Sequence, residues 1–144
     1  MSTTGKRRFI FFIGISFLVA ALLGIDRLVY LRRLMWSASA IKDIGAVYHS
    51  CEKPVEFLAP MNGLSLMEKC NSKIDHEQFR QSARQITVFP GGCANTSVIA
   101  WGPELHYWAE SWMPLAPKAK RAVLFDDGHS QCVTLEQFAA FGCP

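Results

Sequence analysis

Cysteine is the residue type in this sequence with the widest chemistry, through disulfide bonds, metal binding and nucleophilic attack. The chain of 144 residues contains five cysteines, which are Cys51, Cys70, Cys93, Cys132 and Cys143. No two are spaced as Cys-x-x-Cys, so neither a zinc site nor a thioredoxin-like redox motif is indicated. Because five is odd, at most two disulfides form and one thiol is left over. The sequence leaves open which cysteines pair, and it also allows several buried free cysteines.

Histidines and carboxylates are the remaining candidates for catalysis. They are Glu104, His106, Asp126, Asp127 and His129. A nucleophile pair of Cys132 and His129 is disfavoured, because residues three apart on a strand point to opposite faces. Asp126 and His129 are expected to make only an exposed contact across the end of a hairpin, and such contacts are weak.

Metal and phosphate sites are not indicated either. His49 with Cys51, or His129 with Cys132, offers two ligands at most, whereas a structural zinc site needs four. Pro90-Gly91-Gly92 lacks the lysine and the following helix of a phosphate-binding loop. We therefore predict no catalytic residue, no metal and no cofactor, and we expect that the protein is not an enzyme.

Length and composition limit the class of protein further. The length suits one domain, and a chain that is 50% hydrophobic and 19% charged is not intrinsically disordered. A net charge of +3 is too small to indicate a nucleic-acid partner.

An apolar segment near the N-terminus accounts for much of this hydrophobicity. No charged residue occurs from Phe9 to Ile25, and residues 28–31 extend the apolar stretch by another turn. A helix that crosses a bilayer needs about 20 apolar residues, with a range of about 17–25. Lipid is therefore the expected partner of residues 9–31, which we interpret as a transmembrane anchor.

The flanking residues predict that this anchor is not cleaved. Residues 6–8 are basic, which suits both a signal peptide and an anchor. The small-x-small pattern that cleavage needs occurs only at residues 38–40, far beyond the apolar run. All five cysteines follow the anchor, and disulfides persist in oxidising compartments. We predict a cytoplasmic tail over residues 1–8, the anchor over 9–31 and an extracytoplasmic domain over 32–144.

The remaining sequence predicts one long helix followed by short strands. Apolar residues recur at helical spacing up to Cys51, ahead of Pro54, which extends the anchor into an amphipathic helix. A short helical segment is expected at Leu64–Lys69 and a polar helix at Asp75–Gln85, with Asp75 as its N-cap. Residues 86–89, 97–101, 121–125 and 129–133 have strand character, and Thr134 is expected to cap a helix over residues 135–141.

Asp127-Gly128 is the strongest turn signal in the chain. Between two β-rich segments, this dipeptide predicts a two-residue type I′ hairpin turn. In that register Phe125 pairs with Ser130, and Val123 pairs with Cys132. We therefore expect the Cys132 side chain on the face of Val123 and Phe125, taken as the core face.

A loop from Glu104 to Lys120 is rich in aromatic residues. Its candidate interaction patch consists of Tyr107, Trp108, Trp112 and Met113. One interpretation folds these side chains over the sheet as part of the core. The other exposes them to a partner protein or to the membrane interface, where tryptophan and tyrosine are enriched.

Three segments share their order with a known family. They are VLFDDGHSQCVTLEQFAAF (123–141), SASAIKDIGAVYHS (37–50) and TSVIAWGPE (96–104). The first resembles the C-terminal hairpin of bacterial pilin-like and pseudopilin-like proteins with a prepilin-type processing-associated domain. The others resemble part of that family's long first helix and the strand before its hairpin. The resemblance implies an α+β fold, in which a long N-terminal helix packs on a small antiparallel sheet.

The sequence departs from that family's pattern at two places. The processing motif places an aromatic residue or Met after a Gly, with a Glu inside the apolar segment. Here Lys6 follows Gly5, and Phe9–Ile25 contains no Glu. In addition, Pro117 occupies the position of the histidine that precedes the Asp-Gly, and the nearest upstream histidine is His106.

Together these features predict a single-pass protein of the bacterial inner membrane, with a cytoplasmic N-terminus and a periplasmic domain. The resemblance implies contacts with protein partners in a secretion or pilus-type system, and homo- or hetero-oligomers through the N-terminal helix. Small residues at 14, 20, 21 and 24 would allow another helix to approach closely. One alternative is an unrelated membrane-anchored periplasmic binding or inhibitor module stabilised by disulfides. A small thiol-dependent enzyme is a weaker alternative.

Overall fold

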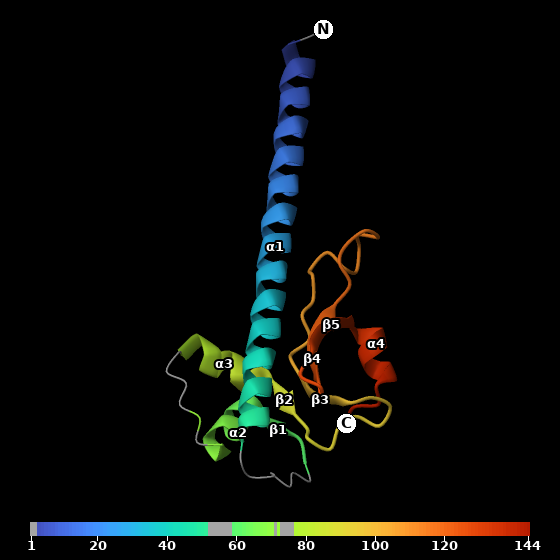
Figure 1. Cartoon of the computed structure of the whole chain (residues 1–144). Helices are drawn as coiled ribbons and strands as arrows, with labels where there is room; N and C mark the ends of the chain where they lie inside the picture. The colour runs from blue at the N-terminus through green and yellow to red at the C-terminus, as the bar shows by residue number, and fades with distance from the viewer. Residues whose placement is uncertain (1–2, 52–58, 71, 73–76) are drawn as a thin grey trace.

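A computed structural model describes residues 3–51, 59–70, 72 and 77–144. The chain is an α+β protein in which a long N-terminal helix packs against a small antiparallel sheet, which confirms the predicted fold class (Figure 1). In chain order the elements are α1 (Thr3–Ser50), β1 (Met61–Asn62), α2 (Gly63–Lys69), α3 (Glu77–Gln85), β2 (Thr87–Val88), β3 (Val98–Trp101), β4 (Lys120–Phe125), β5 (Ser130–Thr134) and α4 (Leu135–Ala140).

The helix α1 has two halves with different environments. Its 48 residues extend roughly 72 Å at 1.5 Å per residue. Every residue from Phe9 to Leu22 is exposed. From there on, one face is buried or half-buried at intervals of three or four residues, at Leu23, Asp26, Tyr30, Leu34, Ser37, Ile41, Ile44 and Tyr48. The helix ends at Ser50, as expected, and only its second half belongs to the folded domain.

The main hydrophobic core lies between α1 and the sheet. Within the described residues the strands follow the order β1-β2-β3-β4-β5, and every neighbouring pair is antiparallel. A Cβ atom on Gly45 would lie 2.7 Å from the Leu124 side chain, so a glycine is what lets α1 approach β4 this closely. The largest fully buried side chains of this core are Ile41, Ile44, Leu66, Ile86, Val88 and Leu124.

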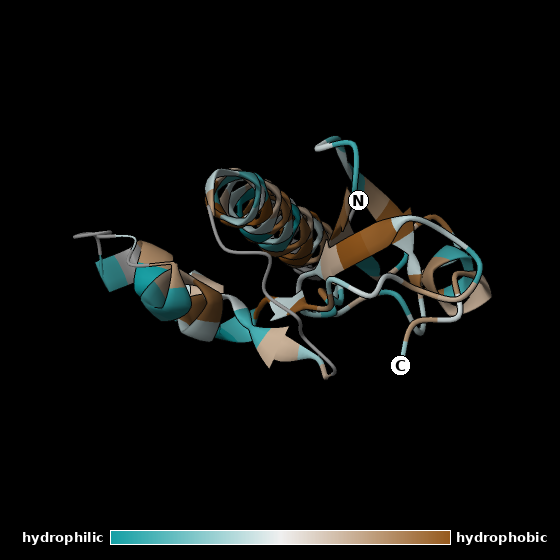
Figure 2. Cartoon of the chain, turned by 60° about the horizontal axis from the view of Figure 1, so that its bottom comes forward, coloured by the Kyte–Doolittle hydropathy of each residue, from teal (hydrophilic) through white to brown (hydrophobic). Residues whose placement is uncertain are grey.

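The opposite face of the sheet carries α4 and the C-terminal residues. The strands between α1 and α4 are largely hydrophobic and are brown in Figure 2. Trp101 and Phe138 pack with their ring centroids 5.6 Å apart. Thr134 caps α4 as expected, because its side chain accepts a hydrogen bond from the Gln137 amide while the Gln137 side chain accepts one from the Thr134 amide.

The predicted hairpin register between β4 and β5 is wrong by one residue. Leu124 pairs with Ser130 and Ala122 with Cys132, so Phe125 does not pair with Ser130. The Gly128 amide donates to the Phe125 carbonyl, and the Phe125 amide donates to the His129 carbonyl, which makes the loop three residues long. Gly128 takes the left-handed conformation at φ +85° that ends such a loop.

This shift moves the Cys132 side chain to the other face of the sheet. Cys132 packs with Ala122 and Leu124 against the core beneath α1. Val123 and Phe125, expected on its face, instead pack in the cluster beneath α4. The alternation of side chains along a strand makes this exchange complete, because a one-residue slip moves every residue to the opposite face.

Two short elements differ from expectation in smaller ways. The two-residue strand β1 has no counterpart in the sequence prediction, and it pairs with β2 through Met61–Val88 and Asn62–Thr87. The polar helix begins at Glu77 in the structure, and Asp75, its expected N-cap, lies outside the described residues.

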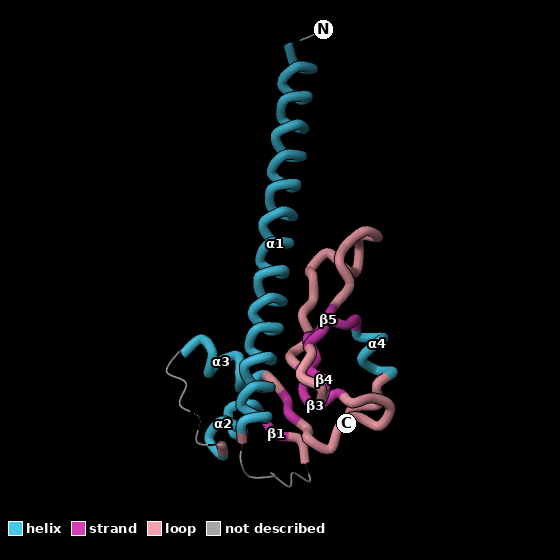
Figure 3. Tube along the Cα trace, viewed as in Figure 1, coloured by secondary structure: helices cyan, strands magenta, loops and turns pink. Residues whose placement is uncertain are grey.

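The connection from β3 to β4, residues 102–119, is here called the aromatic loop. It leaves the sheet and extends along α1 towards the N-terminal half of that helix, as the long pink segment of Figure 3 shows. Its two ends are joined where the backbones of Leu105 and Lys120 exchange hydrogen bonds of 2.9 and 3.1 Å. The loop is therefore a defined extension of the sheet that reaches beyond the main core.

Candidate interaction surface

The exposed half of α1 is the most extensive apolar surface of the molecule. Large side chains such as Ile10 and Phe17 are 68% and 74% exposed. Among the described residues, one helix is long and apolar enough to cross a membrane, and its most apolar window is not buried by the rest of the chain. A Cβ atom at Gly14 or Gly24 would meet nothing within 4 Å. This half contributes nothing to the domain core and is available to lipid or to another helix.

The aromatic loop attaches to α1 just after this exposed half. The Tyr107 hydroxyl donates a hydrogen bond of 3.2 Å to the carbonyl of Leu23, and the Tyr30 hydroxyl donates one of 3.1 Å to the carbonyl of Lys118. The two tyrosine rings meet edge to face, 6.0 Å apart. With Ala109, these tyrosines form a third buried cluster, separate from the two that flank the sheet. The loop is therefore held to α1 at two levels.

The structure divides the four residues of the predicted patch into two pairs. Tyr107 is buried against α1, and Met113 is half-buried in the same cluster. Trp108 and Trp112 remain 53% and 54% exposed, with their ring centroids 5.1 Å apart. Leu115, which was not part of the predicted patch, is 95% exposed in the same loop. The large apolar side chains exposed on the loop are thus two tryptophans and a leucine.

Charged side chains hold the base of the loop together. Arg121 on β4 donates to Glu104 over 2.7 Å, and His106 lies 3.5 Å from both Glu104 and Glu110. Glu110 accepts a hydrogen bond of 2.7 Å from the Ala119 amide. Burial lowers the pKa of Arg121, and the neighbouring Glu104 partly offsets that effect. Glu104 and His106, considered at first for catalysis, therefore have a structural role in the loop.

Asp26 is a charged residue at the contact between α1 and this loop. Its Oδ2 atom is buried and has no hydrogen-bond partner among the residues described. A cavity of about 210 Å³ lies beside it, lined also by Arg33, Glu104 and His106. The carboxylate thus faces the aromatic loop, while its neighbour Arg27 is exposed.

A larger groove of about 770 Å³ lies between α1, α3 and the start of the aromatic loop. Arg32, Arg33 and Trp36 line it from α1, and Gln85 lines it from α3. Within the described parts of the chain, neither arginine forms an ion pair, and the buried Ser37 hydroxyl has no hydrogen-bond partner. Glu104, which is paired with Arg121, also lines the groove, so two arginines face one carboxylate in what is here called the basic groove. The groove was not predicted, because α1 and α3 are far apart in the sequence.

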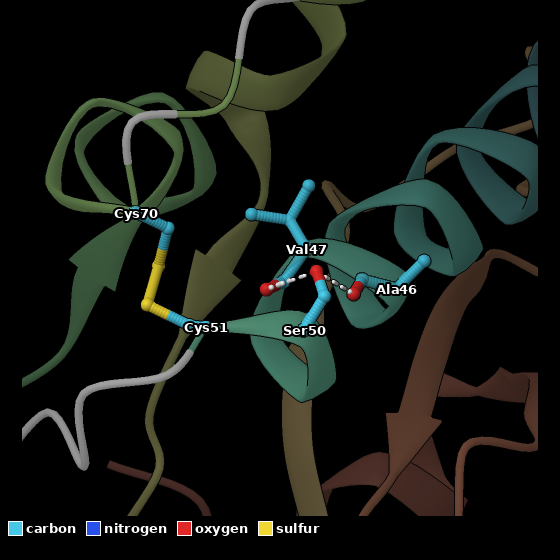
Figure 4. Close-up of a disulfide and its surroundings, with 5 residues drawn as sticks. All are labelled: Ala46, Val47, Ser50, Cys51 and Cys70. Atoms are coloured by element: carbon cyan, nitrogen blue, oxygen red, sulfur yellow. Dashed lines mark hydrogen bonds between the residues drawn. A yellow bond between two sulfur atoms is a disulfide. The ribbon is translucent and has the colours of Figure 1, made fainter.

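Four of the five cysteines form two disulfides. Cys51, directly after α1, is bonded to Cys70 at the end of α2, as Figure 4 shows. Cys93, in the turn after β2, is bonded to Cys143 near the C-terminus. The sequence had left this pairing open. Two disulfides suit an oxidising compartment.

Cys132 is the remaining free thiol. Its burial beneath α1 raises its pKa, which is the opposite of what a nucleophilic cysteine requires. The charge of Lys120 lowers this pKa, to a lesser degree. The position of Cys132 is that of a packing residue.

The hairpin residues form a local turn contact. Asp127, not Asp126, contacts His129: its side chain accepts a hydrogen bond of 3.1 Å from the His129 amide and also meets the imidazole. These hydrogen bonds lower the pKa of Asp127. The His129 ring stacks on Phe125 at 4.1 Å, and Asp126 donates its amide to Ser97. Asp127 and Gly128 thus shape the turn.

Across the described ranges, no three His, Cys, Asp or Glu side chains are grouped so that they could hold a metal ion. Comparison with known proteins gives no match to a family model, a curated protein or a solved structure. The features that stand out are the exposed half of α1, the aromatic loop attached beside it and the basic groove.

Proposed function

We propose that this protein is a single-pass, pilin-like or pseudopilin-like protein of the bacterial cell envelope, which acts through protein–protein contacts as a structural or accessory component of a secretion or pilus-type system. The observation that carries the proposal is the division of α1: a continuous helix is exposed and apolar in its first half and forms the core of an α+β domain in its second half. The resemblance of residues 37–50, 96–104 and 123–141 to that family supports the same proposal.

The proposed location is the inner membrane, with the N-terminus in the cytoplasm and the domain in the periplasm. The apolar first half of α1 has the composition and length of a membrane anchor. The basic residues 6–8 suit a cytoplasmic tail. Both disulfides belong to the part that follows the anchor, and the periplasm is an oxidising compartment.

The anchor also provides the proposed surface for lateral contacts. Ala20 and Gly24 are four residues apart, so they share one face of the helix. A side-chain-free surface at Gly24 lets another helix come close, and close packing is what drives association in lipid. Leu18 and Leu22 lie on the opposite face and do not offer such an approach.

A fractionation experiment tests the location. In cells that express the full chain with an epitope tag at each end, we expect the protein to stay in the membrane pellet after alkaline carbonate extraction. Protease added to spheroplasts should remove the C-terminal tag and spare the N-terminal tag. Recovery of the chain in the soluble fraction, or the reverse protease pattern, would contradict the proposed anchor or its orientation.

Photo-crosslinking in living cells tests the proposed contacts. A photoreactive amino acid at Ala20 or Gly24 should form discrete protein adducts of defined mass. The matched controls are Leu18 and Leu22, which are equally apolar positions on the other face and should react mainly with lipid. Lipid adducts alone at all four positions would refute lateral protein contacts through this helix.

The basic groove favours the second candidate, a membrane-anchored periplasmic binding module. Arg32 and Arg33 line a groove of about 770 Å³ and are not ion-paired in the described structure. A guanidinium pair of this kind suits an anionic ligand. The binding module would be the better account under two conditions. Arg32→Gln with Arg33→Gln would abolish binding of an anionic ligand, and the crosslinks through Ala20 and Gly24 would be absent in the unsubstituted protein.

A further inference from the structure

We infer that the aromatic loop, residues 102–119, is a second membrane-contacting element, which inserts into the lipid interface of the leaflet on the domain side of the membrane. The inference rests on the proposed membrane anchor. It adds the depth at which the loop lies in the bilayer and the surface by which the loop contacts lipid. The occupant of the exposed Trp108–Trp112–Leu115 surface is the lipid bilayer itself.

The length of the free part of α1 is the first argument. Residues 9–22 are exposed throughout, and their rise is about 21 Å at 1.5 Å per residue. The hydrocarbon core of a bilayer is about 30 Å thick and takes about 20 residues, so a span that begins at Phe9 ends near Leu28. The last residues of that span are the ones that the loop covers. Leu23, which accepts the Tyr107 hydrogen bond, lies roughly 7.5 Å inside this boundary.

Near the domain-side end of the span, charged side chains turn towards protein or towards the head groups and not into hydrocarbon. Arg27, one residue before the calculated end of the span, is exposed, and its long side chain can extend to the head groups. Asp26 also lies within the span, but its buried Oδ2 atom faces the loop and not the exterior. Charged residues in membrane-spanning segments face protein in the same way, because hydrocarbon does not solvate them. Glu110 is directed back to the Ala119 amide and to His106, so its charge does not point outward from the loop.

The outward surface of the loop has the chemistry of an interfacial anchor. Trp108 and Trp112 are half-exposed as a pair, and tryptophan is enriched where the hydrocarbon meets the head groups. Leu115 is almost fully exposed, which is costly in water and favourable in lipid. Lys118 follows at the level of Tyr30, and its ammonium lies 3.7 Å from Glu136 on α4 in an exposed ion pair, from which the long side chain can turn to phosphate groups. Interfacial elements are typically buried about 5–10 Å, which agrees with the depth of Leu23.

Tryptophan quenching in the full chain tests the inference. The protein is reconstituted at low protein-to-lipid ratio into vesicles of phosphatidylcholine, with either ordinary or brominated acyl chains. Trp36→Phe removes the half-exposed tryptophan of the groove, so that Trp101, Trp108 and Trp112 remain. The matched control also carries Trp108→Phe and Trp112→Phe, so only the buried Trp101 emits.

We expect brominated lipid to quench a large part of the emission of the Trp36→Phe protein and none of the control's, while aqueous iodide quenches both weakly. Strong quenching by iodide, with no effect of bromine, would place the loop in water and overturn the inference. Protection from both quenchers would place the loop against protein and overturn it as well. In either case, if the chain still floats with the vesicles, the anchor stands and only the loop inference fails; a chain that does not float refutes the anchor itself.

Discussion

The division of α1 predicts that two equivalent truncations in the same helix have very different effects. Ile44 is fully buried at the centre of the core, and its Cδ1 atom would lie 2.9 Å from a Cβ atom on Gly63. Ile10 is 68% exposed in the half of α1 that the rest of the described chain does not bury. Ile44→Ala should destabilise the domain strongly, whereas Ile10→Ala should leave it unchanged.

The magnitude follows from the carbons removed. Isoleucine to alanine deletes three carbons, and each buried methylene group contributes about 0.8 kcal/mol. The volume left unfilled between α1 and α2 adds to that loss, because packed surroundings relax only in part. We expect Ile44→Ala to lower the free energy of unfolding by about 3 kcal/mol, within the usual range of about 2–5 kcal/mol for such changes.

Hydrogen exchange of the full chain in nanodiscs measures this difference without a denaturant. Amides of β3 and β4 exchange when the domain opens, so about 3 kcal/mol should accelerate their exchange roughly 150-fold. The Ile10→Ala control should match the unsubstituted protein at the same amides. Equal exchange in all three proteins, or equal acceleration by both substitutions, would refute the division of α1 into a free half and a core half.

Three further predictions concern the Cys93–Cys143 disulfide, the hairpin turn and the free thiol. Cys93→Ser with Cys143→Ser opens a disulfide with a sequence separation of 50, and the lost loop-closure entropy should lower the free energy of unfolding by about 4 kcal/mol. The midpoint of urea unfolding measures this loss, and an unchanged midpoint would argue against the bridge. Gly128→Ala should cost about 1–2 kcal/mol in thermal unfolding because its φ is +85°, while Gly14→Ala, which meets open space on an exposed helix, should cost nothing. Burial raises the pKa of Cys132, so iodoacetamide should modify it more slowly than a free thiol at neutral pH, and the rate should still climb above the pH at which an ordinary cysteine has ionised. Rapid alkylation at neutral pH would contradict the burial. The same shift makes the stability of the domain depend on pH: the folded state favours the protonated thiol, so the contribution of Cys132 to stability is lost as pH rises through the raised pKa.

Local patterns were sufficient for the elements that depend on neighbouring residues. The continuous helix ending at Ser50 and the Thr134 cap with Gln137 were expected and are present. Helical periodicity and capping involve residues within one or two turns of each other, so the sequence displays them directly.

The hairpin shows where local patterns fail. Asp127-Gly128 predicts a turn correctly, but a two-residue and a three-residue loop both accept that dipeptide. The choice depends on contacts with the rest of the sheet, such as the hydrogen bond from the Asp126 amide to Ser97 on the β3 side. Because the face of Cys132 depends on that choice, a one-residue error reversed its environment.

The sequence by itself determined that the chain has an apolar N-terminal helix, a small α+β domain and enough cysteines for two bridges. Only the tertiary structure decided that Cys93 bonds to Cys143, that Tyr107 turns in against Leu23 and that Trp108 stays out. Residues 107 and 108 are neighbours of similar chemistry, and nothing in their order distinguishes them. Their difference arises because α1, more than 70 residues earlier in the chain, offers a carbonyl and an apolar face to one of them and not to the other.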